Sequence, residues 1–172
     1  MEEPMALKSS HWIGGEWIFH HEDLMTIIIR APQHAEEQNI MLELKTHQGA
    51  CHCGAVKFEI DAPSQLHAHA CNCSICYQSG GDQMIVPTSR FRLLCGEDAI
   101  TTYTFNTGAA QHTFCKHCGI KAFYTPRSNP DGFSVNLRCL DRTHVKSIVV
   151  DSFDGQNWEQ NAGALAHLSR EG

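Results

Sequence analysis

The sequence lacks the surplus of positive charge that a nucleic-acid-binding protein usually carries. Its 172 residues include 13 Lys and Arg against 19 Asp and Glu, which gives a formal net charge of −6. Proteins that bind nucleic acid mostly neutralise phosphates with a basic surface. Direct electrostatic binding to nucleic acid is therefore not expected.

Long apolar runs and a secretory signal are also missing. The longest apolar candidate covers residues 24–29 and stops at Arg30, far short of the roughly 18 residues that a membrane span needs. The N-terminus, MEEPM, is acidic where the first part of a secretory signal would be basic. We expect no membrane partner and a cytoplasmic location, with the nucleus as the alternative. The sequence does not indicate an oligomeric state.

Cysteine, by contrast, is abundant, and seven of the nine cysteines form three tight clusters: CHC at 51–53, CNCSIC at 71–76 and CKHC at 115–118. Cysteines two or three positions apart can direct their sulfurs at one ion, whereas such close neighbours rarely form good disulfides. In a reducing compartment this pattern favours metal binding. The other two, Cys95 and Cys139, lie in apolar stretches and are given no role.

Two of the clusters can form one closed site. A structural zinc ion usually has four ligands, contributed as two pairs by separate chain segments. Both two-cysteine clusters precede a glycine, Gly54 or Gly119, that permits a tight turn. The sequence therefore predicts a structural zinc ion with four ligands, which are Cys51, Cys53, Cys115 and Cys118.

The central cluster supplies three more thiolates, from Cys71, Cys73 and Cys76. Three protein ligands with an open fourth position are typical of catalytic zinc, so the seven cysteines predict two zinc ions. Two alternatives remain open: one zinc ion that combines this cluster with a single outside ligand, and a redox-active thiol group without metal. A histidine could also close the second site, and the candidates are His67, His69 and His112.

The spacing excludes several familiar zinc and thiol proteins. A zinc finger of the two-cysteine, two-histidine type needs histidines three to five positions apart, but only His144 and His167 follow Cys118. The zinc deaminase signature needs a suitably placed acid and a PCxxC run, and Phe114 precedes Cys115. A thioredoxin-type site would be expected beside a βαβ pattern, which is absent.

From residue 40 onward the pattern is typical of strands. Short runs rich in Val, Ile, Phe, Tyr and Thr are separated by Gly, Pro, Asn and Asp. The expected strands cover residues 40–45, 55–61, 83–86, 91–95, 100–105, 112–114, 120–124, 133–137 and 145–153. Only residues 158–168 are predicted as a helix. The fold class is thus all-β and mainly antiparallel, with a short C-terminal helix.

Composition and pattern also suggest where the domain begins and ends. Residues 1–46 are strongly acidic and show no clean periodicity, so they are treated as an N-terminal extension. Residues 47–160 are expected to form the zinc-binding domain, and residues 161–172 a C-terminal tail. The closed site would join an early hairpin to a late one, while the open cluster would lie on a loop.

Several segments of the chain resemble one known family. They are GACHCGAVKFEI, CNCSIC, VPTSRFRLLCGEDAITTYTFNT, HTFCKHCGIKAFYTPRSNPDGF and a final pair, Leu140 and Asp141. The family is that of the glutathione-dependent formaldehyde-activating enzymes, and TTYTFNT, AQHTFCKHCG and FYTPRSNP resemble its centromere protein V group. The resemblance covers roughly residues 47–160. It implies a zinc-bound β-sandwich of the Mss4-like type, with the structural and catalytic zinc ions on the same seven cysteines.

The resemblance also implies an activity, carbon–sulfur lyase chemistry. The family forms or cleaves S-hydroxymethylglutathione, so the implied partners are the small-molecule thiol glutathione and a small aldehyde. After Cys76 this chain has YQSGG where many family enzymes carry a basic residue, which leaves the choice of substrate open. Arg127 and the basic residues between Lys116 and Lys146 are candidate ligands for the glutathione carboxylates. No general base is identified.

Two other functions remain open at the level of sequence. One is a zinc-stabilised binding module without catalysis, as in the centromere protein V group, with chromatin or cytoskeletal partners. The other is a thiol redox sensor built on CNCSIC, which would form reversible disulfides in place of binding metal. A resemblance does not settle the choice, because function depends on the site.

Overall fold

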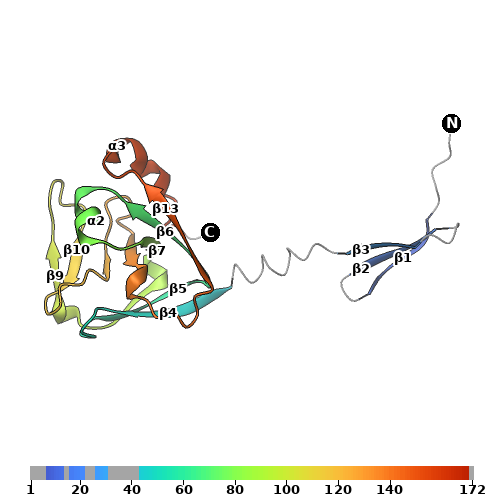
Figure 1. Ribbon diagram of the computed structural model, residues 1–172, viewed down its shortest axis with the longest axis horizontal. Helices are drawn as coiled ribbons and strands as arrows, with labels where there is room; N and C mark the ends of the chain where they lie inside the picture. The colour runs from blue at the N-terminus through green and yellow to red at the C-terminus, as the bar shows by residue number, and fades with distance from the viewer. Residues whose placement is uncertain (1–6, 14–15, 22–25, 31–42, 171–172) are drawn as a thin grey trace. The chain divides into compact units, whose positions relative to one another are not determined.

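A computed structural model describes residues 7–13, 16–21, 26–30 and 43–170 of the chain (Figure 1). It divides into two compact units, Met1–Leu42 and Glu43–Gly172. In the first unit, strands β1 (Leu7–Ile13), β2 (Glu16–His21) and β3 (Thr26–Arg30) form an antiparallel sheet in the order β1-β2-β3. The sequence pattern did not predict these three strands.

The second unit contains the three cysteine clusters. Its strands are β4 (Leu44–Ala50), β5 (Lys57–Pro63), β6 (Gln65–Cys71), β7 (Gln83–Pro87), β8 (Phe91–Cys95), β9 (Ile100–Tyr103), β10 (His112–Cys115), β11 (Phe123–Tyr124), β12 (Gly132–Asn136) and β13 (Ser147–Phe153). Its helical segments are α2 (Ser74–Ser79), α3 (Trp158–Asn161) and the 3-10 turns Thr88–Arg90, Glu97–Ala99, Leu137–Cys139 and Ala162–Leu165. The predicted C-terminal helix exists but is shorter, since α3 passes into a 3-10 turn.

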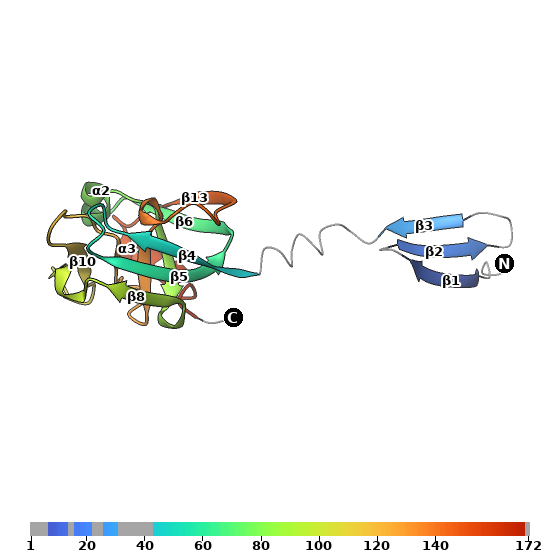
Figure 2. The same ribbon diagram turned by 90° about the horizontal axis from the view of Figure 1, so that it is seen from below.

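Two sheets form the body of this unit, and the hairpin β9–β10 forms a third. Their strand orders are β4-β5-β8 and β11-β12-β7-β6-β13, and β4, β5 and β8 lie side by side in Figure 2. Strands pair antiparallel, except that β13 runs parallel to β6. The prediction of an all-β, mainly antiparallel fold is confirmed.

An aromatic core joins the two large sheets. Phe58 and Ile60 of β5 are fully buried, and strand β5 alternates buried and partly exposed residues as a strand with one apolar face should. Phe91 at the start of β8 stacks on Phe133 of β12, with ring centroids 4.1 Å apart, and Phe58 meets Phe123 of β11 edge to face at 5.3 Å. Aromatic rings bury large apolar areas, so these contacts hold the sheets together as a sandwich.

Strand β6 is the main element of the second unit that the pattern missed. Its sequence, QLHAHAC, contains no β-branched residue, yet Leu66 and Ala68 point into the core. It pairs with β13 over seven positions and carries Cys71 at its end. The expected strand at 40–45 is only partly testable, because residues 40–42 lie outside the described residues; the described strand, β4, begins at Leu44.

The helices of the described residues are all too short or too polar to cross a membrane.

Candidate functional site

The fold brings together the four cysteines predicted to form a closed site. Cys51 follows β4 and Cys115 ends β10, while Cys53 and Cys118 lie in the turns that come next. The four sulfur atoms all lie within 4.8 Å of one another. The Sγ atoms of Cys51 and Cys53 are 3.6 Å apart, and those of Cys53 and Cys115 are 3.7 Å apart.

Both turns are shaped so that backbone N–H groups point toward the sulfurs. Gly54 and Gly119 have positive φ angles of 75° and 73°, as their place after each cysteine pair predicted. The N–H of Val56 donates to Sγ of Cys51 at 3.3 Å. Backbone N–H groups, first that of Ile120, also lower the pKa of Cys118 to about 6. These donors stabilise thiolates, the form that binds metal.

The geometry fits a tetrahedral zinc ion and does not fit a disulfide. With a Zn–S distance of about 2.3 Å, tetrahedral sulfurs lie about 3.8 Å apart, close to the separations found here. A disulfide needs about 2.05 Å between sulfurs, and all nine cysteines are free. A set of four thiolates is also the donor set that structural zinc prefers.

The three cysteines of the central cluster form a second group. Cys71 ends β6, Cys73 caps the N-terminus of α2, and Cys76 is buried within that helix. Their sulfurs lie within 4.8 Å of one another. Hydrogen bonds from the thiols of Cys71 and Cys76, followed by backbone N–H groups of Cys76 and Ile75, lower the pKa of Cys73 to about 2. The two neighbouring thiols, and then the helix backbone, thus favour a thiolate at Cys73. Because α2 begins at Ser74, the prediction that the cluster lies on a loop was wrong.

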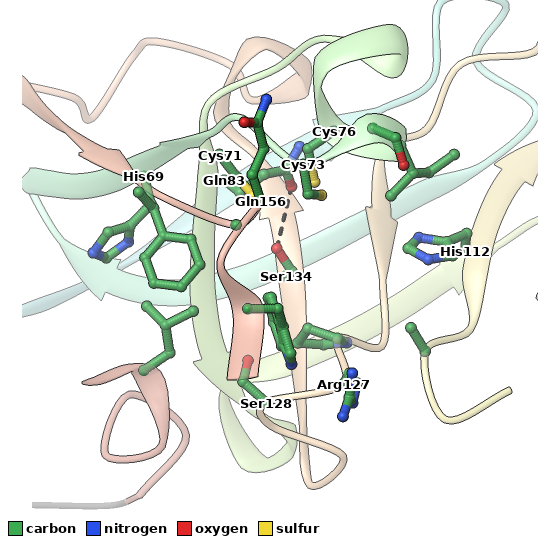
Figure 3. A pocket seen from close by; sticks show the side chains of 18 of the residues that line it. His69, Cys71, Cys73, Cys76, Gln83, His112, Arg127, Ser128, Ser134 and Gln156 are labelled. Atoms are coloured by element: carbon green, nitrogen blue, oxygen red, sulfur yellow. Dashed lines mark hydrogen bonds between the residues drawn. The ribbon is translucent and has the colours of Figure 1, made fainter. Parts of the chain in front are cut away.

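A pocket of about 680 Å³ opens at this second group. All three cysteines line it, whereas none of the four cysteines of the closed group does. In Figure 3 the cysteines lie at one end of the pocket, His69 and His112 flank it on opposite sides, and Arg127 lies away from the sulfurs. A volume of roughly 300–1,000 Å³ is typical of small-molecule sites. The second group can therefore meet a ligand, and the closed group cannot do so from this pocket.

The loop after β13 covers one side of the three sulfurs. The Asn72 amide donates to the Asp154 carboxylate at 3.1 Å, and the N–H of Gln156 donates to the Asn72 side-chain oxygen at 3.0 Å. These bonds place Gly155 against the cluster. A Cβ atom at Gly155 would lie only 2.4 Å from Sγ of Cys71, so the sulfur occupies the space that a side chain would need.

Gly155→Ala is therefore expected to displace the Cys71 sulfur and to weaken metal binding at the three-cysteine group, by about 10–100-fold as for other changes that disturb ligand orientation. The measurement is competition for zinc with a chromogenic chelator, which distinguishes the two cysteine groups by their affinity for metal. Gly163→Ala is the matched control, because no atom lies within 4 Å of a Cβ placed there. Equal affinity in the two variants would show that the loop does not support the site.

Buried polar groups interact electrostatically with the three-cysteine group. The Lys121 ammonium is buried, 3.1 Å from Nδ1 of His112 and 4.0 Å from the centre of the Tyr124 ring. Burial lowers the pKa of Lys121, while the thiolates of the three-cysteine group oppose that shift. Burial also raises the pKa of Tyr124. In the same wall, the Ser134 hydroxyl donates to Gln83 at 3.2 Å (Figure 3).

The histidines considered as a fourth ligand do not join the three sulfurs. Among the described residues, the second group that could hold a metal ion contains Cys71, Cys73 and Cys76 alone. His67 is exposed and contacts the Asp151 carboxylate at 2.7 Å. His69 and His112 line the pocket outside the group. A metal ion held by these three sulfurs would therefore have its fourth position open toward the pocket.

Most of the basic residues that were candidate ligands do not line the pocket. Of the six basic residues between positions 116 and 146, only Arg127 lines it. Its guanidinium donates to Glu159 at 2.7 Å and lies 5.9 Å from the Trp158 ring centre. Lys121 is buried, and Arg138 contacts Asp82.

The sequence model of the family described as "Glutathione-dependent formaldehyde-activating enzyme" matches residues 46–154, a stretch that contains both cysteine groups. The chain belongs to this family. The family that the cysteine motifs indicated is thereby confirmed.

Individual relatives agree with this assignment. A protein of Emericella nidulans is 32% identical over 127 residues, which cover 71% of this chain and 61% of the relative. One of Talaromyces marneffei is 31% identical over 78 residues, covering 42% of this chain and 41% of the relative. Both carry the family's name as a provisional designation. The matched segments thus span less than two thirds of either relative.

A solved structure is also similar. The crystal structure of a Rhodobacter sphaeroides protein superposes with a TM-score of 0.50 at 33% identity, covering 59% of this chain and 99% of the other. The part of the chain it covers is comparable in extent to the part that the family model matches, so nearly the whole of that protein corresponds to the domain described here.

Proposed function

We propose that this chain is a zinc-dependent carbon–sulfur lyase that forms or cleaves an adduct of glutathione with a small aldehyde, such as S-hydroxymethylglutathione. The observation that carries the proposal is the opening of the three-cysteine group into a pocket of about 680 Å³. Membership of the family supports the same chemistry. The catalytic unit in this proposal is residues 47–160.

Two zinc ions would be the cofactors. Cys51, Cys53, Cys115 and Cys118 would hold the structural ion, and the three-cysteine group would hold the catalytic ion. When bound there, zinc would hold a thiol sulfur as thiolate beside the aldehyde. Three thiolates and one Zn²⁺ carry a net negative charge, which favours holding a nucleophilic sulfur over strong polarisation of a carbonyl.

The chain's own residues would then act mainly by placing the reactants. The pocket holds both reactants next to the cysteines and limits water around them, so the reaction gains from proximity and orientation. Arg127 in the pocket wall is our candidate for binding a glutathione carboxylate, in exchange for its contact with Glu159. The substrate would therefore extend from the cysteines toward Arg127.

The proposed function predicts that the protein speeds up the exchange between free formaldehyde and its glutathione adduct. This exchange also occurs without enzyme, so the measurement is two-dimensional exchange NMR with ¹³C-formaldehyde, with and without the zinc-loaded protein. We expect the rate to rise at least about tenfold at micromolar protein. S-methylglutathione, which has no free thiol, is the control for the thiol requirement. A zinc-loaded protein that leaves the exchange rate unchanged would refute the lyase function.

A further inference from the structure

His112 has a defined place in the pocket wall. It begins β10, is 5% exposed, and lines the pocket together with the three-cysteine group (Figure 3). Its ring is stacked between Phe105, at 5.3 Å, and Tyr124, at 5.1 Å between centroids. Both faces of the imidazole are therefore covered, and only its edge can meet a ligand.

The first ring nitrogen, Nδ1, is occupied by Lys121. The two nitrogen atoms are 3.1 Å apart, and an ammonium group has only donors to offer. Nδ1 therefore accepts the hydrogen bond and carries no proton of its own. Lys121 is itself fixed, because it is buried and lies over the Tyr124 ring. Burial lowers the pKa of Lys121, and the negative thiolates of the three-cysteine group oppose that shift.

The second ring nitrogen, Nε2, is left for the pocket. Within the described part of the chain, no hydrogen bond to this atom is found. It is also not one of the fully buried polar atoms without a partner, which fits an atom that a pocket ligand can reach. Burial, and then the charge of Lys121, lower the pKa of His112 to about 4. The ring is therefore neutral near pH 7, and a neutral ring that accepts at Nδ1 must carry its proton at Nε2.

We propose that His112 is a catalytic residue whose Nε2–H donates a hydrogen bond to the aldehyde oxygen as the carbon–sulfur bond forms, and that Lys121 is a positioning residue that fixes this tautomer. The role rests on the lyase function proposed above. Negative charge that develops on an oxygen is stabilised most by donors already in place. A neutral imidazole held in one tautomer is a known form of such a donor.

The step balances without an oxidant or reductant. The thiolate sulfur attacks the aldehyde carbon, a carbon–sulfur bond forms, and the π electron pair of the carbonyl moves to oxygen. His112 stabilises that oxygen through its hydrogen bond and keeps its own proton. The proton that the thiol released on binding is replaced from water at the oxygen, which gives the hydroxymethyl thioether. Cleavage follows the same path in reverse.

The test is His112→Phe, which keeps an aromatic ring between Phe105 and Tyr124 but removes the donor. We expect kcat to fall about 100-fold, the usual effect of removing one such donor, with the KM for glutathione within about threefold and two zinc ions retained. His112→Gln, whose amide nitrogen can reach the position of Nε2, should have a kcat about tenfold higher than that of His112→Phe. His144→Phe, the same change at an exposed histidine outside the pocket, is the matched control.

A second readout, the tautomer itself, does not depend on activity. Imidazole ¹⁵N shifts of the wild-type protein should show His112 neutral at pH 7 with its proton on Nε2, and Lys121→Met should produce a mixture of tautomers. A proton on Nδ1 in the wild type would overturn the proposal, even if His112→Phe were inactive or failed to fold. Full turnover in His112→Phe would overturn it while leaving the lyase function intact. A wild-type protein without turnover would refute the lyase function, and the donor role with it.

Discussion

Replacing Cys76 by alanine is expected to reduce turnover by roughly 1,000-fold or more while the protein stays folded. Cys76 supplies one of the three sulfurs at the end of the pocket, and a site of two thiolates no longer defines an open tetrahedral position. The variant should lose the metal ion of this group and keep the ion of the closed group. Alanine nearly fills the space of the buried thiol, so the core should tolerate the change.

The measurement combines the formaldehyde exchange rate, zinc content and circular dichroism for the same preparation. Cys95→Ala is the matched control, because Cys95 belongs to neither group and is exposed. Turnover that survives in the Cys76 variant would show that the three-cysteine group is not catalytic. If neither the wild type nor the variant showed turnover, a zinc-stabilised binding module would become the better account.

Replacing Cys118 is expected to affect the stability of the fold, in contrast to the effect of Cys76 on turnover. The closed group joins the turn after β4 to the turn after β10, and Cys53 and Cys115 are 62 positions apart along the chain. Metal binding that holds distant segments together contributes directly to folding. Cys118→Ala should therefore lower the free energy of unfolding by at least about 4 kcal/mol and Tm by roughly 15 °C.

Thermal unfolding, monitored by circular dichroism, measures this loss of stability. Cys118 is only half-buried, so the loss of core packing contributes little to the result. Cys139→Ala is the matched control, since Cys139 is also half-buried and close to this group without belonging to it. A Cys118 variant as stable as the Cys139 variant would contradict a structural role for the closed group.

The division of the cysteines into four and three could be predicted because it depends on local spacing. Two cysteines separated by one or two residues and followed by glycine define a turn that can present both sulfurs, whatever the rest of the fold does. Gly54 and Gly119 have the backbone angles that this requires. Most strands of the sandwich were predicted for a similar reason, since alternation along β5 directly reflects one buried face.

The rest of the site could not be predicted because tertiary contacts define it. Strand β6 lacks the β-branched residues that mark strands, and it is stabilised by its parallel partner β13. Gly155 lies 84 positions from Cys71 in sequence, and only the pairing of these strands brings the two together. Lys121 was considered only as one of the basic residues between Lys116 and Lys146, and nothing local indicated that it would be buried against His112.

The central claim is that seven cysteines hold two zinc ions, one of them open to a pocket. Elemental analysis of protein purified without chelator or added metal tests it most directly, as zinc per chain in the wild type and in Cys76→Ala. The account predicts two zinc ions in the wild type and one in the variant. One zinc ion per chain in both proteins would contradict it, because the three-cysteine group would then hold no metal.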